Sequence, residues 1–369
     1  MVKKWLLHWL IFSVRPAAAC DEETESFMHT EQHKNRISRG GVLWLLGGLL
    51  AVLFLVSFCL GRYGVPVGQV MRILVGQIFP IPHQWTDTME TLVLNVRMPR
   101  ILMACLIGCC LAAAGAAYQG VFQNPMASPD LLGASDGAAF GAALFILLGA
   151  STRQITLWAF LMSLLTVALV FLIARWALGN RVVNLILAGI MVSSLFKAGT
   201  SYIKLVADPN NQLPAITYWL MGSLSGIKWS QVTLAVPPML LGLVPLFCIR
   251  WRINLLTLGD MEARTLGVHT DRLRLVVIFC ATLLTAASIS AAGMIGWVGL
   301  VIPHLARKLV GSDYKYLLPA SMLLGASFLL AVDNISRNLL AVEIPIGILT
   351  AFVGAPFFVY LLLRREKTL

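Results

Sequence analysis

Apolar segments of membrane-spanning length recur along this chain and constrain its fold more than any other feature. A spanning helix needs roughly 20 apolar residues, because the hydrocarbon core is about 30 Å thick and each helical residue rises about 1.5 Å. We therefore expect an all-α polytopic membrane protein with about ten transmembrane helices. The predicted spans are residues 42–61, 99–119, 131–149, 155–176, 182–206, 231–250, 273–294, 297–310, 317–332 and 345–363. The eighth segment is short enough for a re-entrant alternative to stay open.

The composition supports this class, since 58% of the residues are hydrophobic and only 12% are charged. A soluble globular domain carries about twice that share of charge. The sequence divides into a polar N-terminal extension, residues 1–40, and a transmembrane domain, residues 41–369.

Lysine and arginine are distributed unequally between the two sides of the predicted spans. Most of the 28 basic residues fall in the connections on the side of the two termini. Because cytoplasmic loops carry the excess of Lys and Arg, both termini are predicted to be cytoplasmic. This placement also accounts for most of the net charge of +11, so no nucleic-acid partner is expected.

The first forty residues allow two interpretations. Lys3 and Lys4 precede an apolar run over residues 5–14, and residues 17–20 (AAAC) resemble a weak signal or lipoprotein cleavage site. The stretch 21–39 is instead strongly polar and ends in basic residues, as a cytoplasmic flank does. We favour an uncleaved cytoplasmic extension of uncertain role.

Patterns for catalysis and metal binding are absent from the sequence. None of the seven cysteines stands at zinc-ligand spacing beside histidines, and they are interpreted as small core residues. No pair of histidines or carboxylates has catalytic spacing within the spans, and no Gly-x-x-x-x-Gly-Lys-Ser/Thr phosphate loop occurs. We expect no catalytic residue, no metal, no cofactor and no nucleotide site in this chain.

One connection, residues 254–274, differs from the short loops expected between neighbouring spans. It is polar and places Glu262 and Arg264 between Gly259 and Gly267. This pattern predicts two short helices with a turn between them. A cytoplasmic element of this kind suits docking of a soluble partner.

Two groups of charged residues lie at or within the spans. Arg97 and Arg100 introduce the second span and Arg337 follows the ninth, all on the outer side, where basic residues are disfavoured. They either snorkel to lipid headgroups or dock an acidic partner. Lys197 and Lys204 stand two helical turns apart on the fifth span and hence near one face.

A charged group in hydrocarbon is costly, so the lysine-bearing face is expected to meet a polar cavity. The functional interpretation is a translocation path for an anionic cargo, lined by Lys197, Lys204, Ser193 and Thr200. The alternative is that Lys204 snorkels to the outer interface and only Lys197 is deep. Asp136 in the third span is a further candidate, either lining the path or satisfying helix termini.

Six motifs, in order and spacing, are similar to FecCD-type permeases, the family of ABC importers for iron-siderophores, haem and cobalamin. The resemblance runs from about residue 42 to the C-terminus. The motifs are residues 97–100 (RMPR), 123–137, 218–223 (YWLMGS), 259–268, 299–307 and 345–356.

The resemblance implies the architecture of a type II ABC importer permease in the bacterial cytoplasmic (inner) membrane. It implies three protein partners besides membrane lipid: a second permease subunit, a cytoplasmic ABC ATPase dimer that holds ATP and Mg, and a periplasmic or lipid-anchored substrate-binding protein. The second subunit is either an identical chain or a paralogue.

The resemblance also implies roles for individual residues. Coupling helices at about 254–272 would rest on the ATPase, and outer arginines would receive glutamates of the binding protein. The cytoplasmic gate is a weaker assignment, because relatives often have small polar residues where this chain has an arginine and two valines. The implied residues are, for ATPase coupling, Gly259, Asp260, Glu262, Ala263, Arg264, Leu266 and Gly267; for docking, Arg97, Arg100 and Arg337; and for the gate, in the inner loop before span five, Arg181, Val182, Val183 and Asn184.

The expected function is translocation of a metal chelate by alternating access, driven by the separate ATPase. Ferric siderophore is the first expectation for the cargo, and haem, cobalamin or molybdate are alternatives. A secondary transporter is less favoured, because it has no reason to keep a docking segment between its spans.

Overall fold

The computed structural model describes residues 38–61, 63–80, 82, 85–179 and 181–365. Most of the predicted N-terminal extension, residues 1–40, lies outside this range. The chain divides at Gly41, and the fold is that of the second unit, Val42–Leu369.

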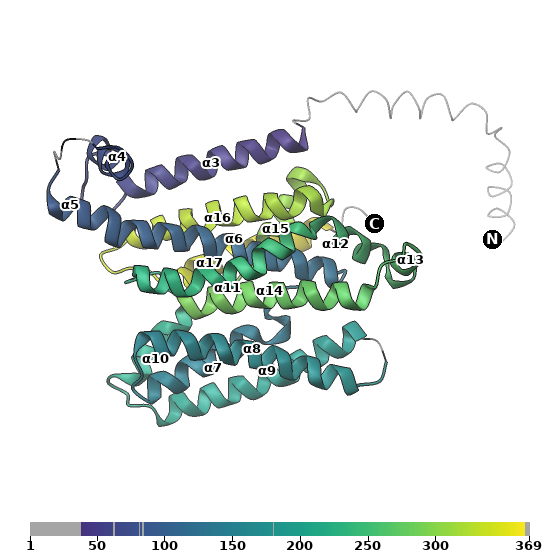
Figure 1. The fold of residues 1–369 in the computed structure, drawn as a ribbon. Helices are drawn as coiled ribbons and strands as arrows, with labels where there is room; N and C mark the ends of the chain where they lie inside the picture. The colour runs from purple at the N-terminus through teal and green to yellow at the C-terminus, as the bar shows by residue number, and fades with distance from the viewer. Residues whose placement is uncertain (1–37, 62, 81, 83–84, 180, 366–369) are drawn as a thin grey trace, which may run out of the picture. The chain divides into compact units, whose positions relative to one another are not determined.

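Every regular element in the described part of the chain is a helix (Figure 1). The elements in chain order are α3 (Arg39–Cys59), α4 (Val67–Gly76), α5 (Asp87–Thr91), the π-helical turn η1 (Leu92–Arg97), α6 (Met98–Val121), the 3₁₀ turn η2 (Pro129–Leu132), α7 (Ala134–Leu147), α8 (Thr152–Trp176), α9 (Arg181–Val206), α10 (Gln212–Met221), α11 (Trp229–Cys248), α12 (Arg250–Leu258), α13 (Asp260–Thr265), α14 (Thr270–Ala292), α15 (Val298–Val310), α16 (Tyr314–Asn338) and α17 (Ile346–Arg365).

Within the described residues, seven helical stretches are long and apolar enough to cross a membrane. They are α3, the continuous stretch Asp87–Val121, α8, α9, α11, α14 and α16. The remaining three predicted spans correspond to α7, α15 and α17. The chain is therefore an all-helical, multi-pass membrane protein of the predicted class.

The third predicted span is shorter than expected. Residues 131–149 were predicted to span, but α7 contains only 14 residues, about 21 Å of helix. Gly133 (φ 73°) and Gly149 (φ 69°) adopt the left-handed conformation on either side of α7. Glycine adopts this conformation without a steric penalty. Gly133 therefore precedes the first residue of α7, and Gly149 follows the end of the helix.

Helix α6 forms the centre of one group of helices and is buried along almost its whole length. It packs against α14, α15 and α16. A Cβ atom added at Gly108 would overlap the carbonyl of Gly325 in α16, and one added at Gly115 would overlap the carbonyl of Gly299 in α15. Small residues of this kind allow helix backbones to touch, which is how helices associate where water supplies no driving force.

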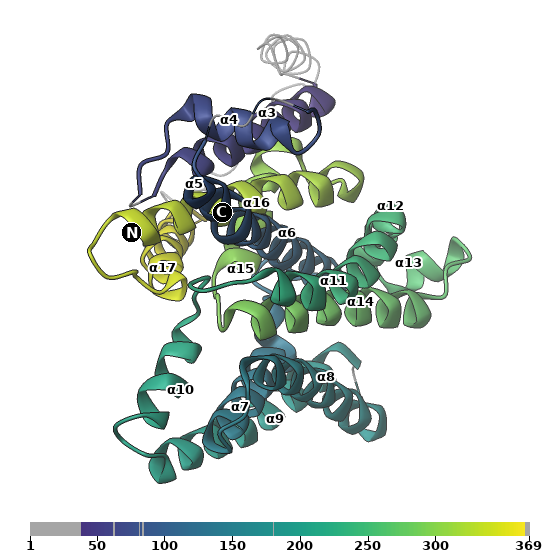
Figure 2. The same ribbon diagram turned by 60° about the vertical axis from the view of Figure 1, so that its left-hand side comes forward.

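Helices α7, α8 and α9 pack on one another and form a second group, which meets the first mainly through α14 (Figures 1 and 2). The helices α4 and α10, each of ten residues, were not predicted, and neither was the short helix α5. All three are too short to span a membrane, so a search for spanning segments does not find them. Helix α10 packs against α7 and α17.

Three backbone segments that are distant in sequence meet through glycines beside α10. The amide of Ser223 donates to the carbonyl of Ala292, and the amide of Ile346 donates to the carbonyl of Gly222. A Cβ at Gly222 would press on the carbonyl of Met294. The ends of α10 and α14 are thereby joined to the start of α17.

Candidate functional site

The connection between α11 and α14 folds as two short helices, α12 and α13, which is the arrangement expected from its sequence. The turn between them is at Gly259 (φ 116°), and Gly267 (φ 78°) ends the segment. These backbone conformations favour glycine over any residue with a Cβ. The glycines therefore determine where each short helix stops.

Helix α12 is attached firmly to the membrane helices. Ile253 and Leu256 are buried, and α12 packs against α6 and α16. The side chain of Asn254 donates to Asp313 Oδ1 at 2.8 Å, in the connection before α16. Gln123 Nε2, in the connection after α6, donates to the carbonyl of Leu256 at 2.6 Å. A displacement of α12 would therefore reach both α6 and α16.

The described side chains of α13 and the residue after it differ in exposure. Ala263 is fully buried and Glu262 is exposed, and Leu266, which follows the helix, is 61% exposed. The amide of Val268 donates to the carbonyl of Ala263 at 3.1 Å, which closes the turn toward α14. For Asp260 and Arg264 the structure describes the backbone only.

Removing the hydrogen bond between Gln123 and α12 is expected to weaken the transmission of movement from α12 to the end of α6. The substitution Gln123→Ala deletes one hydrogen bond, which contributes about 1 kcal/mol. For the ATP-driven import that the sequence resemblance implies, we expect substrate transported per ATP hydrolysed to fall about two- to fivefold. The measurement is coupled uptake and ATPase activity of the reconstituted importer. An unchanged ratio would show that this bond transmits nothing.

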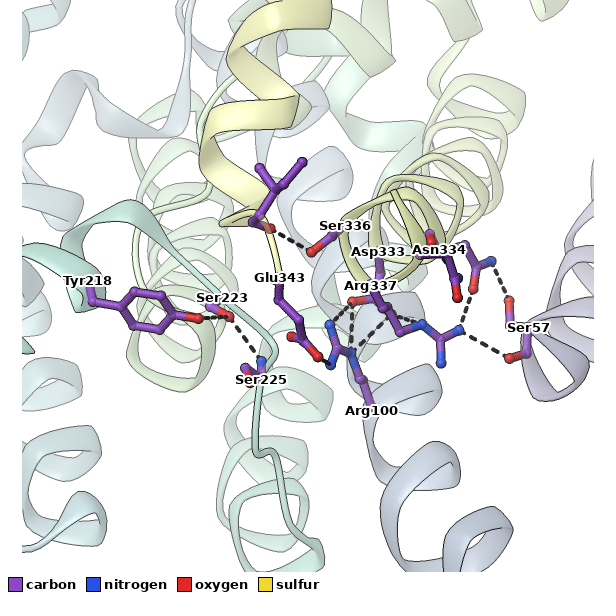
Figure 3. A network of polar contacts seen from close by, with 12 residues as sticks. Ser57, Arg100, Tyr218, Ser223, Ser225, Asp333, Asn334, Ser336, Arg337 and Glu343 are labelled. Carbon is purple, nitrogen blue, oxygen red and sulfur yellow. Dashed lines mark hydrogen bonds and ion pairs between the residues drawn. The ribbon is translucent and has the colours of Figure 1, made fainter. Parts of the chain in front are cut away.

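The start of α6 and the end of α16 hold a buried network of charges (Figure 3). Arg100 Nε donates to Asp333 Oδ1 at 2.9 Å, and Arg100 Nη1 donates to Glu343 Oε1 at 3.0 Å. The side chain of Asp333 is completely buried, and that of Glu343 is 27% exposed. Glu343 lies between α16 and α17, so Arg100 ties the start of α17 to α6.

Two further arginines complete this network. Arg337 Nε lies 3.4 Å from Asp333 Oδ2, and Arg337 Nη2 donates to the carbonyl of Ser57 at 3.1 Å. Arg97 donates to the backbone carbonyls of Phe58 and Tyr63. The network therefore also fastens the end of α3 and the segment that follows it.

Both interpretations of the outer arginines assumed exposed guanidinium groups, and that assumption is wrong. Arg97, Arg100 and Arg337 are only 4%, 8% and 7% exposed. Arg337 does not follow the ninth span but lies in the last turn of α16. Docking of a binding protein requires side chains that project from the surface, and this structure does not present these three in that way.

Sequence reasoning missed the acidic partners, Asp333 and Glu343. Asp333 directly follows the predicted span 317–332 and lies near the end of α16, and a carboxylate in a membrane helix is itself a signal of a paired or functional group. That signal was available, but the identity of the partner was not. Arg100 and Glu343 are separated by 243 positions.

Of the predicted path residues, the structure brings three together. Lys197 Nζ lies 3.5 Å from Asp136 Oδ2, with side-chain exposures of 68% and 12%. Ser193 also hydrogen-bonds this carboxylate. Lys204 lies two turns further along α9, apart from this cluster. Thr200 is buried, and its hydroxyl donates to the carbonyl of Phe196 in its own helix.

The four predicted gate residues are not in a loop, contrary to expectation. Arg181, Val182, Val183 and Asn184 form the first turn of α9. Arg181 Nη1 lies 2.5 Å from Asp271 Oδ1 at the start of α14. Asn184 Nδ2 donates to the carbonyl of Ala177 at 3.2 Å, so its side chain closes the connection from α8 instead of facing a path.

The fold is that of a polytopic membrane protein in which two short helices, α12 and α13, connect α11 to α14. The model of the FecCD transport family matches residues 49–364, and the chain belongs to that family. It is therefore an ABC importer permease, a subunit without a catalytic domain of its own. A permease of this kind works with an ATPase and a binding protein.

Similar proteins of known sequence or structure agree with this assignment. The molybdate import permease MolB of Haemophilus influenzae is 39% identical over 88% of this chain and 96% of its own length. A Helicobacter pylori protein named "Probable iron chelatin transport system permease protein" is 39% identical over 76% of this chain and 85% of its own length. A solved inward-facing structure, described as a metal-chelate type ABC transporter, has a TM-score of 0.79 and 39% identity, covering 88% of this chain and 99% of that one.

Proposed function

We propose that this permease translocates a ferric siderophore into the cytoplasm by alternating access, driven by a separate ATPase dimer that docks on α12 and α13. The observation that carries the mechanism is the construction of this segment. It exposes Glu262 and Leu266, while its buried residues and hydrogen bonds join it to α6 and α16. An ATPase that closes against it would move the central helices directly.

The other partners follow from this mechanism. A substrate-binding protein delivers the cargo at the outer ends of the helices, and a second permease subunit, identical or paralogous, completes the path. Both termini are placed in the cytoplasm, with the protein in the cytoplasmic membrane of a bacterium. The excess of lysine and arginine in the inner connections supports this orientation.

The cargo proposal has two supports. An iron chelatin permease is among the similar proteins, and α9 exposes the cationic side chain of Lys197, which favours an anionic cargo. Molybdate is the second candidate, because the molybdate permease matches over almost its whole length and its cargo is also an anion. Haem and cobalamin remain alternatives that the same experiment separates.

The test is binding-protein-dependent uptake by vesicles that contain this permease and its ATPase. Radiolabelled ferric siderophores, haem, cobalamin and molybdate are compared with and without ATP. We expect ATP-dependent accumulation of a ferric siderophore and exclusion of the other three. ATP-dependent uptake of molybdate alone would replace the cargo but keep the mechanism. Uptake that needs an ion gradient and no ATP would overturn the mechanism.

Lys197 provides a narrower prediction. Lys197→Met is expected to lower uptake of an anionic cargo several-fold, because the cationic group is removed from an exposed position on α9. The substitution also leaves the carboxylate of Asp136 without this partner, so Lys197→Met/Asp136→Asn is the matched control. Equal losses in both variants would support contact with the cargo. Recovery in the double variant, or uptake unchanged by Lys197→Met, would contradict it.

A further inference from the structure

Four helices of the first group meet where α6 ends. Helix α12 packs against α6 and α16, and α15 packs against the same two helices. A Cβ atom added at Gly120, one residue before the end of α6, would overlap the side chains of Ile253 in α12 and Tyr314 in α16. Helices α6, α12 and α16 are therefore in direct contact at one glycine, with α15 packed beside them.

Tyr314, the first residue of α16, joins α12 to α6. Its backbone amide donates to Asn254 Oδ1 in α12 at 2.9 Å, and its hydroxyl donates to the carbonyl of Ala116 in α6 at 3.1 Å. Tyr314 is buried, and a hydrogen bond is electrostatically stronger away from water. A displacement of Asn254 with α12 would therefore act on Tyr314.

Arg307, in the last turn of α15, connects the fourth helix to the other three. Its Nη2 atom donates to Gln119 Oε1 in α6 at 2.9 Å, and its guanidinium interacts with the phenol oxygen of Tyr314. The buried side chain of Gln119 also donates to the carbonyl of Leu300, in the first turn of α15, at 3.3 Å. A planar guanidinium can hold two partners at once. Arg307 therefore fixes the end of α15 to α6 and α16 at the place where α12 is attached.

The opposite end of α15 is held against α17. Trp297, the residue before α15, has a left-handed backbone (φ 70°), which is uncommon for a residue with a Cβ. A Cβ atom added at Gly354 in α17 would overlap the Trp297 side chain, and the Trp297 ring meets the Phe358 ring edge to face, with centroids 6.3 Å apart. A movement of α15 would therefore act on α17.

We infer that Arg307 is a positioning residue for ATP-driven import and makes α15 follow α12. It holds the last turn of α15 to Gln119 and Tyr314, so a movement of α12 is carried to α15 and, through the contact of Trp297 with α17, to α17. Coupling between distant sites travels through packed and hydrogen-bonded networks of this kind. The inference rests on the proposed function, because it requires an ATPase that closes against α12 and α13.

The test is hydrogen exchange of the assembled permease and ATPase, with and without a non-hydrolysable ATP analogue, in the parent chain and in Arg307→Met. In the parent chain we expect the analogue to change the exchange of α12, α15 and α17. In Arg307→Met the change in α12 should remain, while the changes in α15 and α17 should fall at least about tenfold. Loss of a hydrogen bond from a charged group alters an equilibrium constant by about that factor or more.

Three further variants separate positioning from a purely structural role. Lys308→Met is the matched control, because Lys308 is the next residue of the same turn and is exposed, and it should behave like the parent chain. Arg307→Lys keeps the charge and a donor for Gln119 and should restore at least about a third of the parent response. Gln119→Leu removes the same hydrogen bond from the side of α6, so the inference stays falsifiable if a change at Arg307 prevents folding. Thermal unfolding and ATPase binding are measured for each variant and should match those of the parent chain.

The outcomes distinguish this inference from the proposed function. If the analogue changes nothing in α12 of the parent chain, docking of the ATPase on α12 and α13 is wrong, and the inference is wrong with it. If α12 responds and α15 responds equally in the parent chain and in Arg307→Met, only the inference is overturned. An equal loss in Lys308→Met would also overturn it. The double variant Arg307→Met/Gln119→Leu should be no worse than Arg307→Met, because two residues that act through one contact are not additive, and additive losses would contradict the inference.

Discussion

Replacing Asp333 with alanine is expected to destabilise the folded permease by about 3–5 kcal/mol, the range found when one partner of a buried ion pair is removed. Asp333 is completely buried and lies between Arg100 and Arg337. Its loss would leave the two guanidinium groups close together without the carboxylate that offsets their charge. Thermal unfolding of the purified protein in detergent, together with its yield in the membrane, measures the effect.

Two control variants divide this effect into its parts. Asp333→Asn keeps the size and one oxygen acceptor but removes the charge, so it should cost less than alanine and more than Glu343→Gln. The Glu343 side chain is 27% exposed, and water can replace part of its interaction with Arg100. If Asp333→Ala unfolds at the temperature of the parent chain, the buried network does not hold α6 and α16 together.

Replacing Leu266 with glutamate is expected to reduce ATP-dependent uptake at least about tenfold while leaving the fold intact. Leu266 is 61% exposed in the segment after α13, so the substitution disturbs no buried contact. A hot-spot side chain at the centre of a protein interface contributes about 2 kcal/mol or more to association, and a buried carboxylate at that position adds a desolvation cost. The measurements are binding of the ATPase to the permease and uptake in vesicles.

The matched control for this variant is Leu178→Glu. Leu178 is 96% exposed and lies at the inner end of the helices, in the connection between α8 and α9, outside the docking segment. The Leu178→Glu variant should bind the ATPase as tightly as the parent chain does. Equal losses in the two variants would show a general effect of negative charge at the inner surface, and no loss at Leu266 would remove α13 from the docking surface.

The positions of the long helices could be read from the sequence alone. The predicted spans 182–206 and 231–250 correspond to α9 (Arg181–Val206) and α11 (Trp229–Cys248), and the predicted span 297–310 corresponds to α15 (Val298–Val310). Hydropathy along the chain is sufficient here, because a helix satisfies its backbone hydrogen bonds within its own segment. The glycines at 259 and 267 likewise indicated the two short helices α12 and α13, since their signal is local.

The roles of the outer arginines could not be read in the same way. Sequence position placed Arg97, Arg100 and Arg337 near the outer side, but it did not show that all three are buried. Their burial depends on groups elsewhere in the chain: Asp333, Glu343 and the backbone at the end of α3. The same holds for Arg181, whose ion pair with Asp271 joins α9 to α14.

By itself, the sequence determined the class of protein, the approximate bounds of the long helices, and the two short helices between α11 and α14, because these depend on local hydropathy and on backbone conformation at single glycines. Only the tertiary structure decided which charges are neutralised inside the protein and which helices touch through Gly108 and Gly115. Those features arise from contacts between residues far apart in the chain, and the free energy of such a contact depends on burial and distance, which no local pattern encodes.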